Sequence, residues 1–246
     1  MKWLSSYIMQ VHPDFQEFSD FINTIPDRMA KQEGLLIYQG RNEIREIEHK
    51  GVKFVVKSFH RTNLINRFVY GTFRSSKAER SFRNAIQLLA IGVGTPQPVA
   101  FINMKKHGLF DRSFYISLHS ACSHVYNDLF EKQFDYEKEV LQAVGRTTAI
   151  LHEHGLAHLD YGRGNILFEK EGDRIIIELV DLNRMHKGPI DMRAGCKNLE
   201  RLPATPQMHR WLAETYAEER HFDAETCFKL MQAFRSTQPG KIDGKY

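Results

Sequence analysis

The stretch Gly155-Leu-Ala-His158-Leu-Asp160-Tyr-Gly-Arg163-Gly-Asn165-Ile-Leu-Phe168 decides which fold we expect for this chain. An Asp is followed five residues later by an Asn, and an apolar run typical of a strand comes next. A second apolar run, 175–180, leads directly into Asp181. Phosphoryl transfer uses a loop Asp, a loop Asn and a later Asp in this arrangement. The spacing therefore predicts a phosphotransfer site.

Each polar residue of this stretch has an expected task. Asp160 would accept a proton from an attacking hydroxyl, while Asn165 and Asp181 would bind the Mg²⁺ that carries the phosphates of ATP. Arg163 lies inside the loop, where its charge could stabilise the phosphoryl group in transit. The alternative for the Asp and Asn is a polar turn. The alternative for the Arg is an ordinary surface side chain.

Three further candidates for ATP binding precede this loop. Lys57 ends a Val-Val-Lys strand segment that resembles the kinase Val-Ala-Ile-Lys pattern, and a helix residue, Glu79, would hold its ammonium. Alternatively, Lys57 faces water, and Glu79 closes a capping box that starts at Ser76. Gly40-Arg41 stands where kinases have a glycine-rich loop and could contact phosphate, although a tight turn alone explains the glycine.

The pattern of apolar residues changes between the two halves of the chain. Residues 1–30 read as a helical or irregular lead-in that ends near Pro26. Strands are expected at 34–38, 43–47, 52–59, 98–102 and 113–118, the first three as an antiparallel meander. A helix at 76–91 would bury one face and end at Gly92. The residues expected on that buried face are Ala78, Phe82, Ala85, Ile86 and Leu89.

The second half reads mainly as helices. A helix is expected over 136–154, with Val140 or Leu141, Val144, Thr148 and Leu151 on its buried face. A hairpin interrupted at 171–173 follows, and helices run from Asn198 to the end. We therefore predict an α+β fold with two lobes, an antiparallel-sheet lobe at 1–118 and a mainly helical lobe at 119–246.

Composition excludes several classes of protein. Three widely spaced cysteines without a Cys-x-x-Cys pair argue against a disulfide scaffold or a structural zinc site, and favour a reducing cytoplasm. No apolar run approaches the ~20 residues of a membrane span. The segment 57–83 carries basic and aromatic residues that could receive an anionic glycolipid or touch a membrane surface, or could simply be solvated. Nucleic acid is not expected, because no recognised binding module is present.

These motifs resemble the protein-kinase-like superfamily, and within it the bacterial lipopolysaccharide core kinases, which include the Kdo and heptose kinases. The resemblance covers roughly Leu35 to Leu202. It is carried by Phe54-Val-Val-Lys57, Lys77-Ala-Glu79-Arg-Ser-Phe82, Gly94-Thr-Pro96-Gln-Pro98-Val-Ala, His158-Leu-Asp160, Gly164-Asn165-Ile-Leu and Lys197-Asn-Leu-Glu-Arg-Leu202. It implies a kinase fold, ATP, Mg²⁺ and a sugar hydroxyl as acceptor, with Kdo foremost. It places the protein in the cytoplasm, or at the inner face of the cytoplasmic membrane.

Departures from the kinase pattern narrow the expectation. Leu159 replaces the Arg that commonly receives an activating phosphate, which argues against a phosphorylation switch. Asn183 replaces the Gly of Asp-Phe-Gly, and no Ala-Pro-Glu follows, which disfavours a peptide acceptor. A RIO-type atypical protein kinase and an antibiotic phosphotransferase remain alternatives, because the same residues would serve them. A pseudokinase that only binds ligands is the alternative outside the enzymes.

Overall fold

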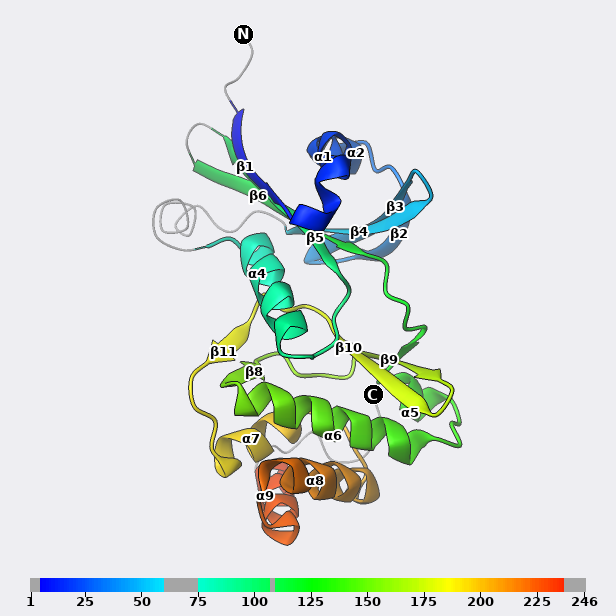
Figure 1. Cartoon of the computed structure of the whole chain (residues 1–246), viewed down its shortest axis with the longest axis vertical. Helices are drawn as coiled ribbons and strands as arrows, with labels where there is room; N and C mark the ends of the chain where they lie inside the picture. The colour runs from blue at the N-terminus through cyan, green and yellow to red at the C-terminus, as the bar shows by residue number, and fades with distance from the viewer. Residues whose placement is uncertain (1–4, 60–74, 107–108, 237–246) are drawn as a thin grey trace. The chain divides into compact units, whose positions relative to one another are not determined.

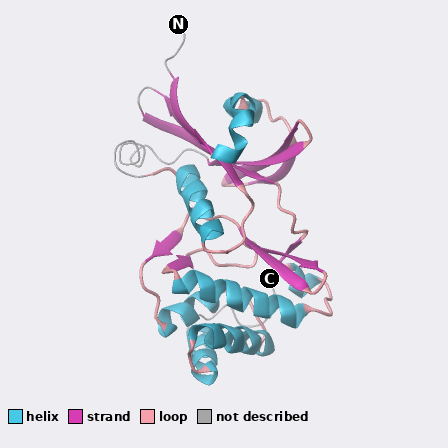
Figure 2. Ribbon diagram, in the orientation of Figure 1, coloured by secondary structure: helices cyan, strands magenta, loops and turns pink. Residues whose placement is uncertain are grey.

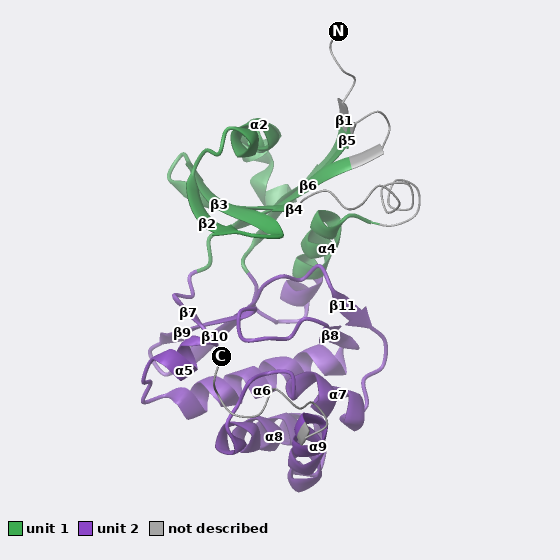
Figure 3. Ribbon diagram, turned by 180° about the vertical axis from the view of Figure 1, so that it is seen from behind, with its two compact units in different colours: residues 1–86, 96–120 green, residues 87–95, 121–246 purple. Residues whose placement is uncertain are grey.

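The computed structural model describes residues 5–59, 75–106 and 109–236, which form two compact units (Figures 1 and 3). Unit 1 comprises residues 1–86 and 96–120, and unit 2 comprises residues 87–95 and 121–246. The sequence predicted one boundary between two lobes, at 118/119. In the structure, residues 87–95 also group with the second half of the chain. This segment joins unit 2 through the backbone, because the N–H of Leu179 donates to the carbonyl of Gly94 at 2.9 Å.

A six-stranded antiparallel sheet forms the body of unit 1 (Figure 2). Its strand order is β1-β5-β6-β4-β3-β2. The predicted meander is confirmed, since β2, β3 and β4 pair in sequence. The strands are β1 (Ser5–Val11), β2 (Leu35–Gln39), β3 (Asn42–His49), β4 (Val52–Phe59), β5 (Pro98–Lys106) and β6 (Leu109–Leu118).

Helices cover the two faces of this sheet. Three short helices, η1 (Pro13–Phe18), α1 (Ser19–Asn23) and α2 (Ile25–Ala30), pack on the face that carries Phe54 and Val56. Side chains alternate between faces along a strand, so Lys57 and Phe59 belong to the other face. There Phe59 packs against Ala78 and Phe82 of α4 (Lys77–Ala90). The sheet thus places Lys57 on the face that α4 covers.

The prediction of a helical or irregular lead-in is wrong for residues 5–11, whereas residues 13–30 form η1, α1 and α2. Residues 5–11 form β1, which pairs along its whole length with β5, from Ser5 opposite Lys106 to Val11 opposite Ala100. Met9 and Val11 pack against the core of unit 1, as alternate residues of a strand do. We also predicted that the lead-in ends near Pro26, but this proline lies in the first turn of α2. A proline is tolerated there because the first N–H groups of a helix have no intrahelical partner.

Helix α4 matches its predicted limits within one residue, and Gly92 follows it with a φ of 78°. Its buried face differs at two predicted positions, since Ile86 is exposed and Leu89 only half-buried, while Leu88 is buried instead. Part of the basic and aromatic segment 57–83 is not among the described residues. Arg61, Arg67, Phe68, Tyr70, Phe73 and Arg74 lie outside the described residues.

Unit 2 combines five helices with two small antiparallel sheets among its described residues (Figure 3). Strands β9 and β10 form the predicted hairpin. The strands are β7 (His124–Val125), β8 (Leu156–His158), β9 (Ile166–Glu171), β10 (Arg174–Leu179) and β11 (Met185–Lys187). The helices are α5 (Asp128–Glu131), α6 (Glu137–Glu153), α7 (Met192–Leu199), α8 (Pro206–Arg220) and α9 (Ala224–Ser236).

Helix α6 is the centre of unit 2 and confirms its sequence prediction. All five residues expected on its inner face are buried: Val140, Leu141, Val144, Thr148 and Leu151. Gly145 allows α8 to approach closely, because a Cβ there would lie 3.1 Å from the Thr215 side chain. Over the described part of the chain, every helix is too short or too polar to cross a bilayer.

Candidate functional site

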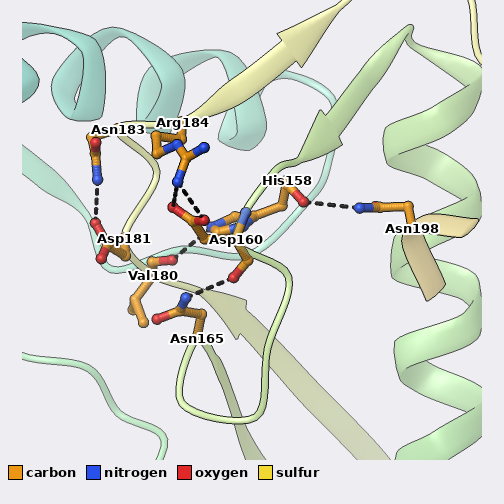
Figure 4. Close-up of polar contacts among 8 residues, drawn as sticks. All are labelled: His158, Asp160, Asn165, Val180, Asp181, Asn183, Arg184 and Asn198. Carbon is orange, nitrogen blue, oxygen red and sulfur yellow. Dashed lines mark hydrogen bonds and ion pairs between the residues drawn. The ribbon is translucent and has the colours of Figure 1, made fainter. Parts of the chain in front are cut away.

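Two neighbouring loops of unit 2 carry four of the predicted site residues, of which Figure 4 shows Asp160, Asn165 and Asp181. Strand β8 pairs with β11, with His158 opposite Met185, and β9 pairs with β10. The loops 159–165 and 180–184 connect these two pairs of strands. The first loop carries Asp160, Arg163 and Asn165, and the second begins with Val180 and Asp181. The strand pairing therefore brings together side chains that lie about 20 residues apart in the sequence.

The buried imidazole of His158 ties the two loops together. Its Nε2 donates to the carbonyl oxygen of Val180 at 3.0 Å, and its Nδ1 accepts the backbone N–H of Asp160 at 3.2 Å (Figure 4). Burial lowers the pKa of His158, because the imidazolium would lose its hydration. The neutral ring can serve both loops, with one nitrogen as donor and the other as acceptor.

The backbone around Asp160 is fixed from two further directions. The side-chain amide of Asn165 donates to the Asp160 carbonyl at 2.8 Å. The next residue, Tyr161, is buried, and its hydroxyl lies 2.7 Å from the hydroxyl of Thr148 on α6. Thr148 in turn donates to the Val144 carbonyl, so the tyrosine is the donor of the pair. The loop is therefore anchored to α6 on one side of Asp160 and to its own Asn on the other.

The carboxylate of Asp160 has a cationic partner that we did not predict. Arg184 Nη1 lies 2.8 Å from one oxygen and 3.2 Å from the other. The backbone of the same residue accepts the N–H of Leu159 at 3.0 Å. The pair is partly exposed, with side-chain exposures of 60% for Arg184 and 34% for Asp160, so it contributes little to stability. Its consequence is to orient the carboxylate.

Asp181 has an unusual backbone conformation, with a φ of 60°. Asp tolerates this left-handed region better than most residues do. Its carboxylate accepts a hydrogen bond from the amide of the buried Asn183 (Figure 4). The residue that replaces the usual glycine therefore holds the Asp181 side chain in place.

The donor chemistry at these loops suits Mg²⁺. The Asn165 amide nitrogen is used in the bond to Asp160, which leaves the amide oxygen as its acceptor atom. The backbone N–H of Val180 donates to the Asn165 carbonyl at 3.0 Å, which holds Asn165 beside the residue that precedes Asp181. Within the described residues, no group of three or more His, Cys, Asp or Glu side chains could hold a metal. Oxygens of phosphate and water would therefore complete the coordination of an ion bound here, as they commonly do for Mg²⁺.

A buried hydrogen-bond chain connects His158, directly before the 159–165 loop, to three helices. Asn198 of α7 donates to the His158 carbonyl at 2.9 Å, and its amide oxygen accepts from His152 of α6 at 3.1 Å. The other nitrogen of His152 accepts the hydroxyl of Tyr216 of α8 at 2.8 Å, and Arg220 donates to the same hydroxyl at 2.9 Å. Both donor and acceptor atoms of the Asn198 side chain are thereby used.

The buried His152 should make unfolding depend on pH. Burial lowers its pKa to about 4, whereas an unfolded histidine has a pKa of about 6.5. Between these values the unfolded chain binds a proton that the folded chain does not, so stability falls as pH falls from 6.5 to 4. The loss from this residue is about 3 kcal/mol. Burial also lowers the pKa of His209 to about 4, so both contribute.

Urea unfolding of wild type and His152→Gln at pH 7, 6 and 5 tests this. We expect the variant to lose part of the pH-dependent free energy of unfolding and to keep the rest, because burial lowers the pKa of His158 and His209 as well. An unchanged slope in the variant would show that His152 is protonated in the folded protein.

The predicted ATP-binding residues lie in unit 1. Lys57 stands on the central strand β4, between Ile44 of β3 and Tyr115 of β6, with its Nζ 5.4 Å from the centre of the Phe59 ring. Glu79 shows half of the predicted capping box, because its N–H donates to Ser76 Oγ at 3.0 Å. Its carboxylate pairs with Arg83 at 2.8 Å. The Lys57–Glu79 pair stays a prediction.

The remaining candidates lie in exposed or half-buried loops. Gly40 and Arg41 make the exposed turn between β2 and β3, so their contact with phosphate stays a prediction. Arg163 is half-buried, and its carbonyl accepts the N–H of Asn127 at 3.2 Å. Sequence reasoning missed Arg184 and gave no role to Asn198. The signal for Arg184 was a cation three residues after Asp181, which is too common to single out.

Comparison with known proteins agrees with this geometry. A family model described as the lipopolysaccharide kinase (Kdo/WaaP) family matches residues 38–218. The solved structure of WaaP in complex with acyl carrier protein is similar at a TM-score of 0.64 and 15% identity, over 94% of this chain and 98% of that chain. The comparison with curated proteins gave no match.

A second similar structure is the Rio2 kinase–ADP/Mg²⁺–phosphoaspartate complex from Chaetomium thermophilum. Its TM-score is 0.53 at 15% identity, over 90% of this chain and 66% of that chain. At this identity the two structures show the fold alone, and they confirm the α+β, protein-kinase-like fold. The family model spans more than half of the chain. The chain therefore belongs to the lipopolysaccharide kinase (Kdo/WaaP) family, and it is a phosphotransferase.

Proposed function

We propose that the protein transfers the γ-phosphate of ATP to a hydroxyl of a sugar in the lipopolysaccharide inner core, with Kdo as the acceptor. One observation supports this most. In a chain of the lipopolysaccharide kinase family, Asp160, Asn165 and Asp181 lie on two loops that His158 joins by hydrogen bonds. This is the arrangement that phosphoryl transfer needs, because the reaction depends on positioning and on charge neutralisation.

In this proposal Asp160 acts as the base. Its carboxylate, oriented by Arg184, accepts the proton of the acceptor hydroxyl as that oxygen attacks phosphorus. Asn165 and Asp181 hold Mg²⁺ through their side-chain oxygens. The bound ion would neutralise charge on the β- and γ-phosphates. The hydrogen bonds to His158, Asn165 and Tyr161 keep the loop from relaxing when charge develops.

The nucleotide contacts come from unit 1. We propose that Lys57 binds the α- and β-phosphates of ATP and that Glu79 positions it, with Gly40 and Arg41 as further phosphate contacts. One contact supports the pairing of Lys57 with Glu79. Phe59, on the same face of β4 as Lys57, packs against Ala78, which directly precedes Glu79 in α4. The ion pair between Glu79 and Arg83 would then have to share the carboxylate with Lys57.

The acceptor also suggests where the protein works. An acceptor carried on a lipid would be met at a membrane surface, so we propose action in the cytoplasm at the inner face of the cytoplasmic membrane. Peripheral membrane contact is a separate proposal. Two described cations of the basic segment have partners within the protein itself: Arg80 donates to the Ser75 carbonyl, and Arg83 pairs with Glu79. Sedimentation with anionic vesicles tests that contact.

An acceptor screen tests the proposed function. Purified protein receives labelled ATP, Mg²⁺ and one of four acceptors: lipid A bearing Kdo, lipid A without Kdo, an aminoglycoside, or a general protein substrate. We expect label on the Kdo-bearing acceptor and none on lipid A alone. Label on a protein, including this one, with none on any sugar would favour the RIO-type alternative. Absence of transfer to every acceptor would favour a pseudokinase.

Arg163 should affect turnover more than ATP binding. We predict that Arg163→Ala lowers kcat at least tenfold with little change in the KM for ATP, because a loop cation near the transferring phosphoryl group acts mainly in the transition state. The loop itself should persist, since its bond to Asn127 uses the backbone. Arg174→Ala, an exposed position at the start of β10, is the control. An unchanged kcat would remove Arg163 from the mechanism.

Arg184 should affect turnover without affecting stability. The ion pair with Asp160 is exposed enough that Arg184→Ala should change the free energy of unfolding by less than about 1 kcal/mol. Loss of carboxylate orientation should lower kcat about tenfold. Steady-state kinetics and urea unfolding of the same preparation separate the two effects. Wild-type turnover in this variant would show that Asp160 needs no such partner.

A further inference from the structure

A cavity of about 430 Å³ opens in unit 2 beside the catalytic loop. It lies between the β8–β11 ladder and helix α7, so a single compact unit supplies all of its walls. The residues that matter for its chemistry are Leu159, His186, Ile190, Lys197, Glu200 and Arg201. Leu159 directly precedes Asp160, which places the cavity next to the proposed base. Its volume falls within the range of small-ligand sites.

Glu200 is the most informative residue that lines the cavity, although its carboxylate oxygens are themselves buried. The residue is 1% exposed, yet within the described part of the chain neither carboxylate oxygen has a hydrogen-bond partner. Buried carboxylates are normally paired, because removing the charge from water is costly. Glu200 also caps the C-terminus of α7, where the helix dipole disfavours a negative charge. Within the described residues, the fold thus buries a carboxylate that lacks a hydrogen-bond partner.

The rest of the wall complements an anionic sugar. Lys197 and Arg201, one turn apart, are exposed cations that line the same cavity as Glu200. Leu159, 36% exposed, and Ile190 add apolar surface. Sugar rings present hydroxyl donors at their edges and C–H groups on their faces. A carboxylate, two cations and an apolar patch can therefore each meet a different part of one such ligand.

We propose that this cavity binds the acceptor, a polyhydroxylated sugar with an anionic substituent. Hydroxyl groups of the sugar donate to Glu200, whose buried carboxylate turns toward the ligand on binding, and the carboxylate or phosphate of the sugar pairs with Lys197 and Arg201. This inference rests on the proposed function and adds the residues that select the substrate. The cavity and the loop also share a residue, since Asn198 lines the cavity and donates to the His158 carbonyl.

Ligand binding without ATP tests the cavity separately from catalysis. Kdo, its methyl ester and a neutral heptose are titrated by saturation-transfer NMR into wild type, Asp160→Asn, Glu200→Gln and the double variant Lys197→Ala/Arg201→Ala. We expect Kdo to bind wild type and to remain bound by Asp160→Asn, because the cavity contacts persist in that variant. The ester and the heptose should bind at least tenfold more weakly. Both cavity variants should weaken Kdo binding at least tenfold, whereas Glu218→Gln and Arg193→Ala, exposed positions outside the cavity wall, should not.

A stability measurement makes the role of Glu200 sharper. Because its buried charge lacks a protein partner, Glu200→Gln should raise the Tm of the ligand-free protein by about 2–4 °C while it weakens binding. A lowered Tm would mean that the carboxylate is paired within the protein, which would overturn the proposal. Equal Kdo binding in the cavity variants, or no Kdo binding to wild type, would also overturn it. The transfer assay still decides the proposed function in each of these cases.

Discussion

Replacing Asp160 by Asn should lower the kcat of phosphate transfer by about 10²–10⁴-fold, the usual contribution of a positioned general base. The amide keeps the shape of the side chain but cannot take up the hydroxyl proton. The surrounding contacts should survive, because the bonds from Asn165 and to His158 use the Asp160 backbone. We therefore expect an unchanged KM for ATP and an unchanged Tm. Single-turnover transfer to lipid A bearing Kdo, followed with labelled ATP, measures the effect.

Asp173 offers a matched control for this prediction. It is an exposed Asp in the turn between β9 and β10, and Asp173→Asn changes the net charge by the same amount. This control should transfer phosphate at the wild-type rate. If Asp160→Asn retained that rate as well, another group would have to accept the proton.

Replacing Asn198 by Ala should damage both stability and turnover. The change leaves the His158 carbonyl and the His152 Nε2–H buried without their partners. Two such orphaned groups should lower the free energy of unfolding by about 2–4 kcal/mol. Turnover should fall as well, because His158 holds the backbone of both catalytic loops. Urea unfolding and steady-state kinetics at pH 7.5 measure the two losses.

A double-mutant cycle with His152 separates a shared network from general damage to α7. Asn198→Ala and His152→Ala remove two ends of the same hydrogen bond, so their effects on stability should be non-additive by at least about 0.5 kcal/mol. Arg193→Ala, on the exposed side of α7, should combine additively with His152→Ala. Additive behaviour of the first pair would disprove the network.

Local patterns predicted most elements of the fold. The meander β2–β4, helices α4 and α6 and the β9–β10 hairpin all follow from apolar spacing and turn residues. The start of the chain did not. Residues 5–11 show helical spacing and strand alternation together, and pairing with β5, 89 to 101 positions away, selects the strand. The local sequence of residues 5–11 does not indicate which distant strand they pair with.

The candidate site was predictable only where its residues form one motif. Asp160, Asn165 and Asp181 follow a spacing that specifies their loops, although their roles still need to be tested. The residues that hydrogen-bond to the site lie far from it in the sequence. Arg184 lies 24 residues from Asp160, and Asn198 lies 46 residues from His152. Glu200 could not be recognised from the sequence, because what distinguishes it is burial without a partner.

The most direct measurement determines where the phosphate goes. Wild-type protein and Asp160→Asn are incubated with ATP, Mg²⁺ and lipid A bearing Kdo, and the product is examined by mass spectrometry and ³¹P NMR. We predict that wild type adds one phosphomonoester to a Kdo hydroxyl and that the Asp160 variant adds none over the same time. Unmodified Kdo alongside phosphate on the protein or on the lipid A glucosamines would contradict the account.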